Sequence, residues 1–63
     1  MTVNEKIKIY LEENGIKQNY VAKKISCNTK TFNNILNGRI KCDAELLKKI
    51  CLVLNEDPNI FLN

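Results

Sequence analysis

Residues 18–37 read QNYVAKKISCNTKTFNNILN, and the spacing of the apolar and small side chains in this stretch decides the fold. These side chains fall at Val21, Ala22, Ile25, Cys27, Phe32 and Ile35. Two short helices that meet at a tight turn need a shared core of this kind, with a small residue such as Ala22 where they cross closely. Ser26 and Cys27 form the expected turn, and Asn28 is a favourable N-cap for the second helix, which continues to about Leu36. The stretch therefore predicts a helix-turn-helix, with its first helix over about 18–25.

A further helix is expected on the N-terminal side, from about Asn4 to Asn14. Thr2 and Glu5 have the spacing of a capping box, and Gly15 is the expected left-handed stop. One face of this helix is defined at helical spacing by Ile7, Tyr10, Leu11 and Asn14.

Two helices are expected on the C-terminal side. Asn37-Gly38 ends the second helix of the pair, and a loop runs over residues 39–42. Asp43 caps a helix that continues to about Leu54, and its predicted core face consists of Ala44, Leu47, Ile50, Cys51 and Leu54. Asp57-Pro58 places an N-cap and an N1 residue in their preferred order, so a last short turn of helix is expected. That turn is closed by Ile60, Phe61 and Leu62.

Length and composition restrict the class of protein. A chain of 63 residues with a hydrophobic fraction of 44% suits one small domain over residues 1–63. The longest apolar run covers residues 51–54, far short of the ~20 residues of a membrane span, and the N-terminus lacks a signal-peptide core. We therefore expect a cytoplasmic protein without membrane contact. Three cysteines without C-x-x-C spacing, and no histidine, predict reduced thiols and no metal site.

Charge is segregated along the chain. Residues 14–42 contain six basic side chains and no acidic one, whereas the remaining residues contain four basic and seven acidic side chains. A compact domain with this pattern has a local positive field stronger than its net charge of +3 suggests. Because the same block contains the predicted helix pair, the sequence predicts a nucleic-acid-binding surface.

At these residues the chain resembles the DNA-binding domains of the lambda repressor and Cro type (Xre family). The resemblance is carried by Ile16-Lys17-Gln18, Val21-Ala22, Cys27-Asn28 and Ile35-Leu36-Asn37-Gly38, and the next helix aligns without gaps through Leu54. It implies an all-α, compact five-helix domain in which helices two and three form the helix-turn-helix. It also implies that Gln18 binds a DNA phosphate and braces the recognition helix. Base edges would be faced by Thr29, Lys30 and Asn34, and the DNA backbone by Asn37, Arg39 and Lys41.

The residues themselves agree with this assignment. With Phe32 and Ile35 turned inward, the side chains that point outward are Thr29, Lys30, Asn33 and Asn34. Lysine can donate to guanine, asparagine can pair with adenine, and threonine can meet a thymine methyl group. The free N–H groups at the helix starts near Gln18 and Asn28 suit phosphate oxygens. Further backbone contacts are expected from Lys17 and Thr31.

Three departures from the family pattern have physical consequences. Ser26 stands where glycine is usual, at a turn that often needs a positive φ, so we expect either a cost of about 1 kcal/mol or a slightly different turn. Lys17 replaces the usual Ser or Thr N-cap. Leu11 and Leu36 occupy the positions of a buried Arg–Glu pair found in many members, so an apolar contact is expected in its place.

The functional hypothesis is a sequence-specific transcriptional regulator of bacterial or phage origin, acting as a dimeric repressor on a palindromic operator. A self-complementary patch for a homodimer is expected at Leu46, Leu52, Phe61 and Leu62, although single exposed leucines are also ordinary surface residues. The alternative is a protein-interaction module, such as an antitoxin or a phage-encoded inhibitor. The absence of histidine, of a glycine-rich phosphate loop and of a convergent carboxylate pair argues against an enzyme, and no cofactor or small-molecule ligand is expected.

Overall fold

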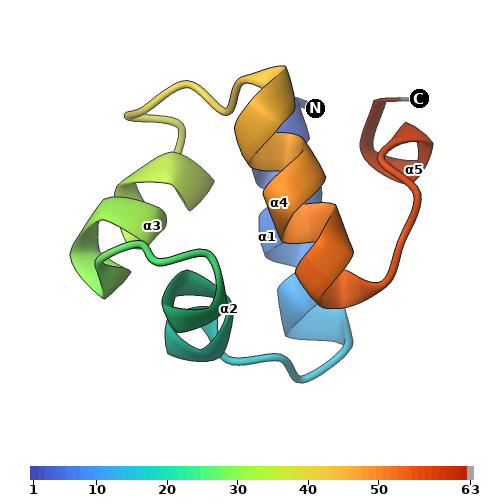
Figure 1. The fold of residues 1–63 in the computed structure, drawn as a ribbon. Coiled ribbons are helices and arrows are strands. Elements are labelled where there is room, and N and C mark those ends of the chain that lie inside the picture. The colour runs from blue at the N-terminus through green and yellow to red at the C-terminus, as the bar shows by residue number, and fades with distance from the viewer. Residues whose placement is uncertain (63) are drawn as a thin grey trace.

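The computed structural model describes residues 1–62, and these form an all-helical domain without strands (Figure 1). The helices are α1 (Val3–Glu13), α2 (Gln18–Lys24), α3 (Thr29–Leu36), α4 (Ala44–Leu54) and α5 (Asn59–Leu62). Their order and number confirm the fold predicted from the sequence.

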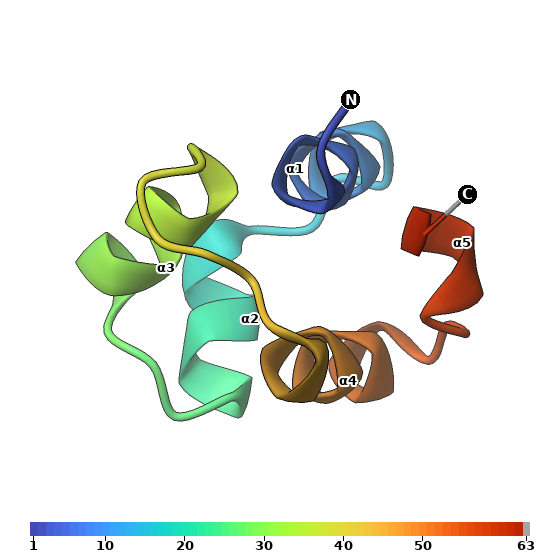
Figure 2. The same cartoon turned by 90° about the horizontal axis from the view of Figure 1, so that it is seen from above.

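The helices are arranged around α1 and α4. Figures 1 and 2 show α2 and α3 on one side of these two helices and α5 on the other. The domain measures 27 × 23 × 22 Å along its principal axes. The helix-turn-helix therefore occupies one end of the molecule, where its outer surface is open.

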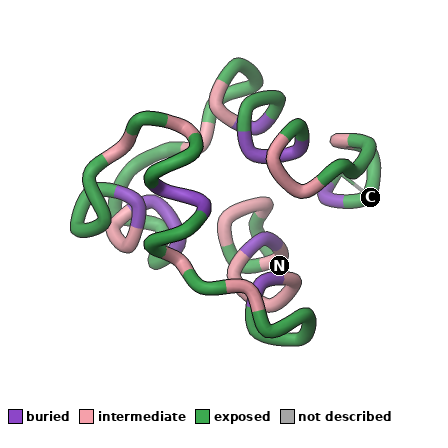
Figure 3. Tube along the Cα trace, turned by 60° about the horizontal axis from the view of Figure 1, so that its bottom comes forward, coloured by how far each residue is buried: buried purple, intermediate pink, exposed green. Residues whose placement is uncertain are grey.

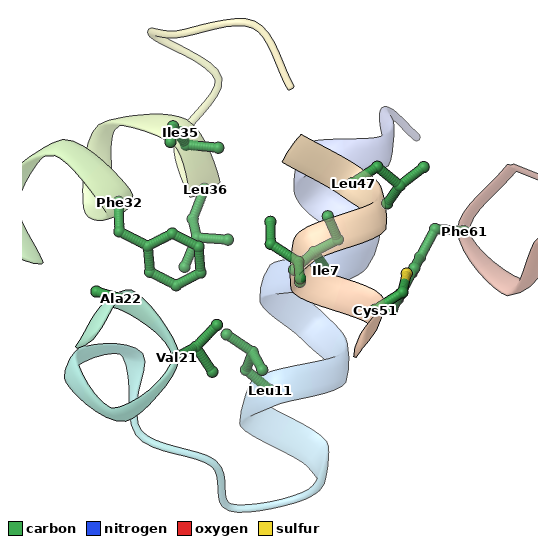
Figure 4. Packing of buried hydrophobic residues seen from close by; sticks show 11 residues of the cluster. Ile7, Leu11, Val21, Ala22, Phe32, Ile35, Leu36, Leu47, Cys51 and Phe61 are labelled. Carbon is green, nitrogen blue, oxygen red and sulfur yellow. The ribbon is translucent and has the colours of Figure 1, made fainter. Parts of the chain in front are cut away.

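The core is a single cluster of buried apolar side chains contributed by all five helices. Phe32 is completely buried and projects from α3 toward α2, beside Ala22 and Val21 (Figure 4). Leu11 and Leu36 are each 1% exposed and belong to the same apolar cluster, so both of these positions lie in the core. Figure 3 shows that the buried residues alternate with exposed ones along each helix, as amphipathic helices require.

The predicted caps are present at four helices, including α5, where Asp57 Oδ1 accepts a hydrogen bond from the Asn59 N–H at 2.9 Å. Thr2 and Glu5 form the full capping box of α1. Asn28 Oδ1 accepts a hydrogen bond from the Lys30 N–H at 2.8 Å, and Asp43 Oδ1 accepts one from the Leu46 N–H at 2.8 Å. Lys17, by contrast, makes no side-chain cap at the start of α2, as its residue type predicted.

Two predicted core or surface assignments are wrong. Ala44 is exposed rather than in the core, because it is the first residue of α4 and none of the other described elements covers it. Phe61 is only 3% exposed, and its ring packs edge-on against Tyr10 with centroids 5.5 Å apart. Phe61 therefore closes the core and cannot belong to an exposed dimer patch.

The other members of the predicted patch differ in exposure. Leu46 is half-buried and packs against the core. Leu52 is 82% exposed and Leu62 is 57% exposed. Of the four residues expected in the patch, only Leu52 and Leu62 are thus available as large apolar surface groups.

Candidate nucleic-acid interface

The outer face of α3 presents polar side chains because its other face is committed to the core. Phe32, Ile35 and Leu36 are buried, which fixes the rotation of the helix about its axis. Thr29, Lys30 and Thr31 are exposed on the first turn. Asn33 and Asn34 are half-buried one turn later. All of the predicted base-facing residues therefore lie on α3. Those in its first turn are exposed, and the two asparagines one turn later are half-buried.

The turn between α2 and α3 is fixed by backbone geometry. Ser26 has φ 57°, the left-handed conformation expected where the family has glycine. The chain then returns sharply, because the Cys27 N–H donates to the Ala22 carbonyl at 2.8 Å and the Ser26 N–H donates to the Lys23 carbonyl at 3.2 Å. This tight return brings the start of α3 against α2.

A side-chain hydrogen bond connects the two helices of the motif. Asn33 Nδ2 donates to Gln18 Oε1 at 3.1 Å, joining the middle of α3 to the first residue of α2. Asn33 Oδ1 in turn accepts from Asn37 Nδ2 at 3.0 Å. Both functional groups of the Asn33 amide thus have partners within the protein. The predicted outward-pointing residue Asn33 acts as a brace in this structure.

The hydrogen bonds of Asn33 and Asn37 extend to α1 through Lys8, a residue that the sequence did not identify. Lys8 Nζ donates to Asn37 Oδ1 at 3.0 Å. The network therefore runs from Lys8 through Asn37 and Asn33 to Gln18, across three helices. No local sequence signal identifies Lys8, because its partner lies 29 positions away in the chain.

The loop after α3 carries two of the predicted backbone-contacting residues. Gly38 adopts φ 81° and ends the helix. Arg39 Nη1 donates to Asn34 Oδ1 at 3.2 Å, so the guanidinium lies beside α3. Arg39 and Lys41 are both exposed. The loop therefore extends the positive surface of α3.

Charge segregation in the sequence becomes segregation in space. The acid-free block 14–42 contains α2, α3 and the following loop, which lie together at one end of the domain (Figures 1 and 2). Lys17, Lys30, Arg39 and Lys41 are all exposed within it. Lys24 Nζ lies 5.7 Å from the centroid of the Tyr20 ring, a cation–π contact on α2.

Other kinds of site receive no support from the part of the chain described. Over residues 1–62, no three His, Cys, Asp or Glu side chains are grouped so as to hold a metal ion. In the same residues, none of the helices has the length and apolar character that crossing a bilayer requires. The three cysteines are free thiols.

Comparison with known proteins gives a family assignment. Residues 6–59 match the family model described as the Cro/C1-type helix-turn-helix DNA-binding domain. Searches of curated proteins and of solved structures found no match. The matched region includes all of α2, α3 and α4 and the loops between them. The chain belongs to the Cro/C1-type helix-turn-helix DNA-binding domain family.

Proposed function

We propose that this protein is a sequence-specific transcriptional repressor that binds a palindromic operator as a homodimer, with α3 in the DNA major groove. The observation that carries the proposal is the outer face of α3. This face presents Thr29, Lys30 and Asn34 at the acid-free end of the domain, on a helix braced through Asn33 and Gln18. Covering a promoter with such a dimer would block polymerase. A cytoplasmic location follows from the same role.

Within this proposal, base readout belongs to three side chains. Lys30 donates to guanine O6 and N7, and Asn34 pairs with adenine N6 and N7. Thr29 contacts a base edge or a thymine methyl group. Asn33 contributes mainly by holding α3 in register, because its amide oxygen and nitrogen are both bonded to neighbouring side chains.

The DNA backbone is contacted on either side of these residues. Polar and basic groups on and around α3 suit phosphate oxygens, and these contacts hold the helix at a fixed depth in the groove. The residues assigned to this role are Lys17, Gln18, Asn28, Thr31, Asn37, Arg39 and Lys41. Lys8 joins them through its hydrogen bond to Asn37.

Dimerisation is proposed through the outer surface of α4, centred on Leu52. This exposed leucine borders a hollow of about 250 Å³, which is also lined by Lys48, Cys51, Glu56 and Pro58. An exposed apolar side chain beside an apolar hollow is self-complementary, as a two-fold interface requires. Lys48 in α4 and Glu56, which follows the C-cap Asn55, both line this hollow, so antiparallel pairing of two copies brings each lysine near the partner copy's glutamate. This opposite-charge pairing favours a second copy as the occupant.

The position of α4 is compatible with DNA binding by the pair. In Figures 1 and 2, α4 lies at the side of the domain, away from the outer face of α3. Pairing through α4 therefore leaves both recognition helices uncovered. The contact is small, so we expect a weak dimer that assembles fully on DNA.

The proposed function is tested by selecting bound sites from random DNA with the purified protein. The expected result is a palindromic consensus whose half-sites are separated by one helical turn, about 34 Å. Failure to enrich any sequence would refute sequence-specific binding. A consensus without two-fold symmetry would refute the dimer while leaving DNA recognition in place.

Variants with matched controls identify the surface that reads the DNA. Lys30→Ala and Asn34→Ala should each weaken operator binding by about 1–3 kcal/mol in a gel-shift titration. Lys6→Ala, which removes the same charge from α1 on the side that faces α5, and Asn59→Ala on α5 should leave it nearly unchanged. Equal effects of all four variants would contradict the assignment. Normal DNA binding by both α3 variants would favour the protein-interaction alternative.

Sedimentation equilibrium tests the dimer surface. Leu52→Asp should yield a monomer, since it places an unpaired charge at the centre of the contact. Lys48→Glu should also weaken association through like-charge repulsion, and the double variant Lys48→Glu with Glu56→Lys should restore it. A charge-swapped pair that stays as dissociated as the single variant would contradict the antiparallel arrangement.

A further inference from the structure

The α3–α4 loop is tied to α1 by one asparagine side chain far away in the sequence. Asn4 Nδ2 donates to the Ile35 carbonyl at 2.6 Å and to the Ile40 carbonyl at 3.1 Å. Ile35 lies in the last turn of α3, and Ile40 lies in the loop beyond Gly38. A single amide group thus fixes the end of the recognition helix and the loop that follows it to the same point on α1.

The two bonds from Asn4 hold both ends of the segment between the Ile35 and Ile40 carbonyls. Within the loop, the Arg39 N–H donates to the Asn34 carbonyl at 2.9 Å, and the Ile40 N–H donates to the same carbonyl at 3.4 Å. These bonds turn the chain around the end of α3. The bond from Asn4 to the Ile40 carbonyl adds a connection to a different helix. Arg39 and Lys41 stand on either side of that anchored carbonyl.

We propose that Asn4 is a positioning residue for DNA binding, because it holds the α3–α4 loop so that Arg39 and Lys41 are set against the DNA backbone before DNA arrives. A loop that is already ordered loses little conformational entropy on binding, whereas a free loop must be ordered at the expense of affinity. Asn4 itself does not contact DNA. The inference rests on the proposed DNA-binding function of this end of the domain.

Asn4→Ala is the informative variant, and Asn14→Ala is its matched control. Asn14 also lies at an end of α1, and its Nδ2 also donates to a carbonyl, that of Tyr10 at 2.8 Å. The control therefore removes the same side chain and one side-chain to backbone hydrogen bond without touching the loop. Thermal unfolding of both variants establishes a temperature at which each remains folded.

Loop order is measured first, without DNA, by amide hydrogen exchange. Asn4→Ala should increase the exchange rates of the Arg39 and Ile40 amides about tenfold or more relative to the amides of α2, because the loop opens locally. Asn14→Ala should leave these rates unchanged. Unchanged loop exchange in Asn4→Ala would overturn the inference whatever the protein does with DNA.

The effect on DNA binding is then measured with a random-sequence duplex over a range of salt concentrations. Asn4→Ala should reduce the slope of log affinity against log salt by about 1 to 2, as expected for loss of the Arg39 and Lys41 phosphate contacts. Arg39→Ala should cost less affinity in the Asn4→Ala background than in the wild type. An unchanged slope with full additivity would overturn the inference. If the wild-type protein binds no DNA, the proposed function fails and the positioning role fails with it.

Discussion

Ser26→Gly should stabilise the protein, since this residue sits in the left-handed region at the turn of the helix-turn-helix. Its φ of 57° costs an L-amino acid with an ordinary side chain roughly 1–2 kcal/mol. Glycine avoids that cost but loses about 0.5–1 kcal/mol more backbone entropy on folding. The difference predicts a net gain of about 0.5–1 kcal/mol in the free energy of unfolding.

The substitution loses no packing or hydrogen bond that would offset this gain in stability. Ser26 is exposed, so the substitution removes little packing. The hydrogen bonds that form the turn use the Ser26 and Cys27 backbone N–H groups, which remain in the variant. For a domain of this size, the predicted gain corresponds to a rise in Tm of about 2–8 °C.

Urea and thermal denaturation followed by circular dichroism measure this change, and Gly38→Ala provides the reverse experiment. Gly38 has φ 81°, and a Cβ placed there would meet no atom within 4 Å. Gly38→Ala should therefore lower the stability by about 1 kcal/mol through backbone conformation alone. A loss of stability in Ser26→Gly, alongside the expected loss in Gly38→Ala, would refute the reasoning about the turn.

Three further predictions concern the core, the pH dependence and a cap. Phe32→Ala removes a fully buried ring, and the loss of about 3–5 kcal/mol should leave this small domain largely unfolded by circular dichroism at 25 °C. Hydrogen bonds from the Thr2 backbone and side chain hold the pKa of Glu5 below its ordinary value of 4.5. The stability from these hydrogen bonds is therefore present above about pH 4.5 and is lost as the pH falls through the folded-state pKa of Glu5. Urea titrations of Glu5→Gln should show a smaller loss of stability in acid than the wild type. Identical pH profiles of the two proteins would contradict this prediction. Asn28→Ala removes the acceptor for the Lys30 N–H and should lower the unfolding free energy by about 1 kcal/mol, whereas an unchanged urea midpoint would contradict the cap.

Most of the fold was predictable because its signals are local. Thr2 with Glu5, Asn28 and Asp43 each lie within three residues of the N–H group that they cap, so their spacing is visible in the sequence. Ser26 was expected to adopt a positive φ from its place in the turn, and it does. Asn55 also adopts a left-handed conformation, with φ 57°, and ends α4. That stop was not predicted, although asparagine is the residue after glycine that tolerates it best.

The errors arise in the shortest helix and at the end of a longer one, where the apolar period does not decide which side chains are covered. α5 has only four residues, so its periodicity does not show whether Phe61 or Leu62 faces inward. Packing against Tyr10 decides in favour of Phe61. Ala44 fits the apolar period of α4, but at the first turn of that helix the period does not guarantee a neighbour to cover it.

The residues of the candidate site were predicted, but the hydrogen bonds that connect them were not. The outward face of α3 followed from Phe32 and Ile35 facing inward. The bonds from Asn4 to the Ile35 and Ile40 carbonyls and from Lys8 to Asn37 connect residues 29 to 36 positions apart, and they exist only once α1 has packed against α3. The bond from the Asn33 amide to Gln18 likewise depends on how α3 packs against α2. The sequence therefore predicted only that Asn33 points outward.

The most direct test of the account is to map the DNA-contacting surface by amide chemical shifts during titration with the selected operator duplex. The account predicts that the largest changes occur in residues 17–18, in the first turns of α3 from residue 28 to 34, and in the loop 37–41, with little change in α5. If operator binding is saturated and the largest chemical shift changes occur elsewhere while the amides of α3 do not move, the account is contradicted.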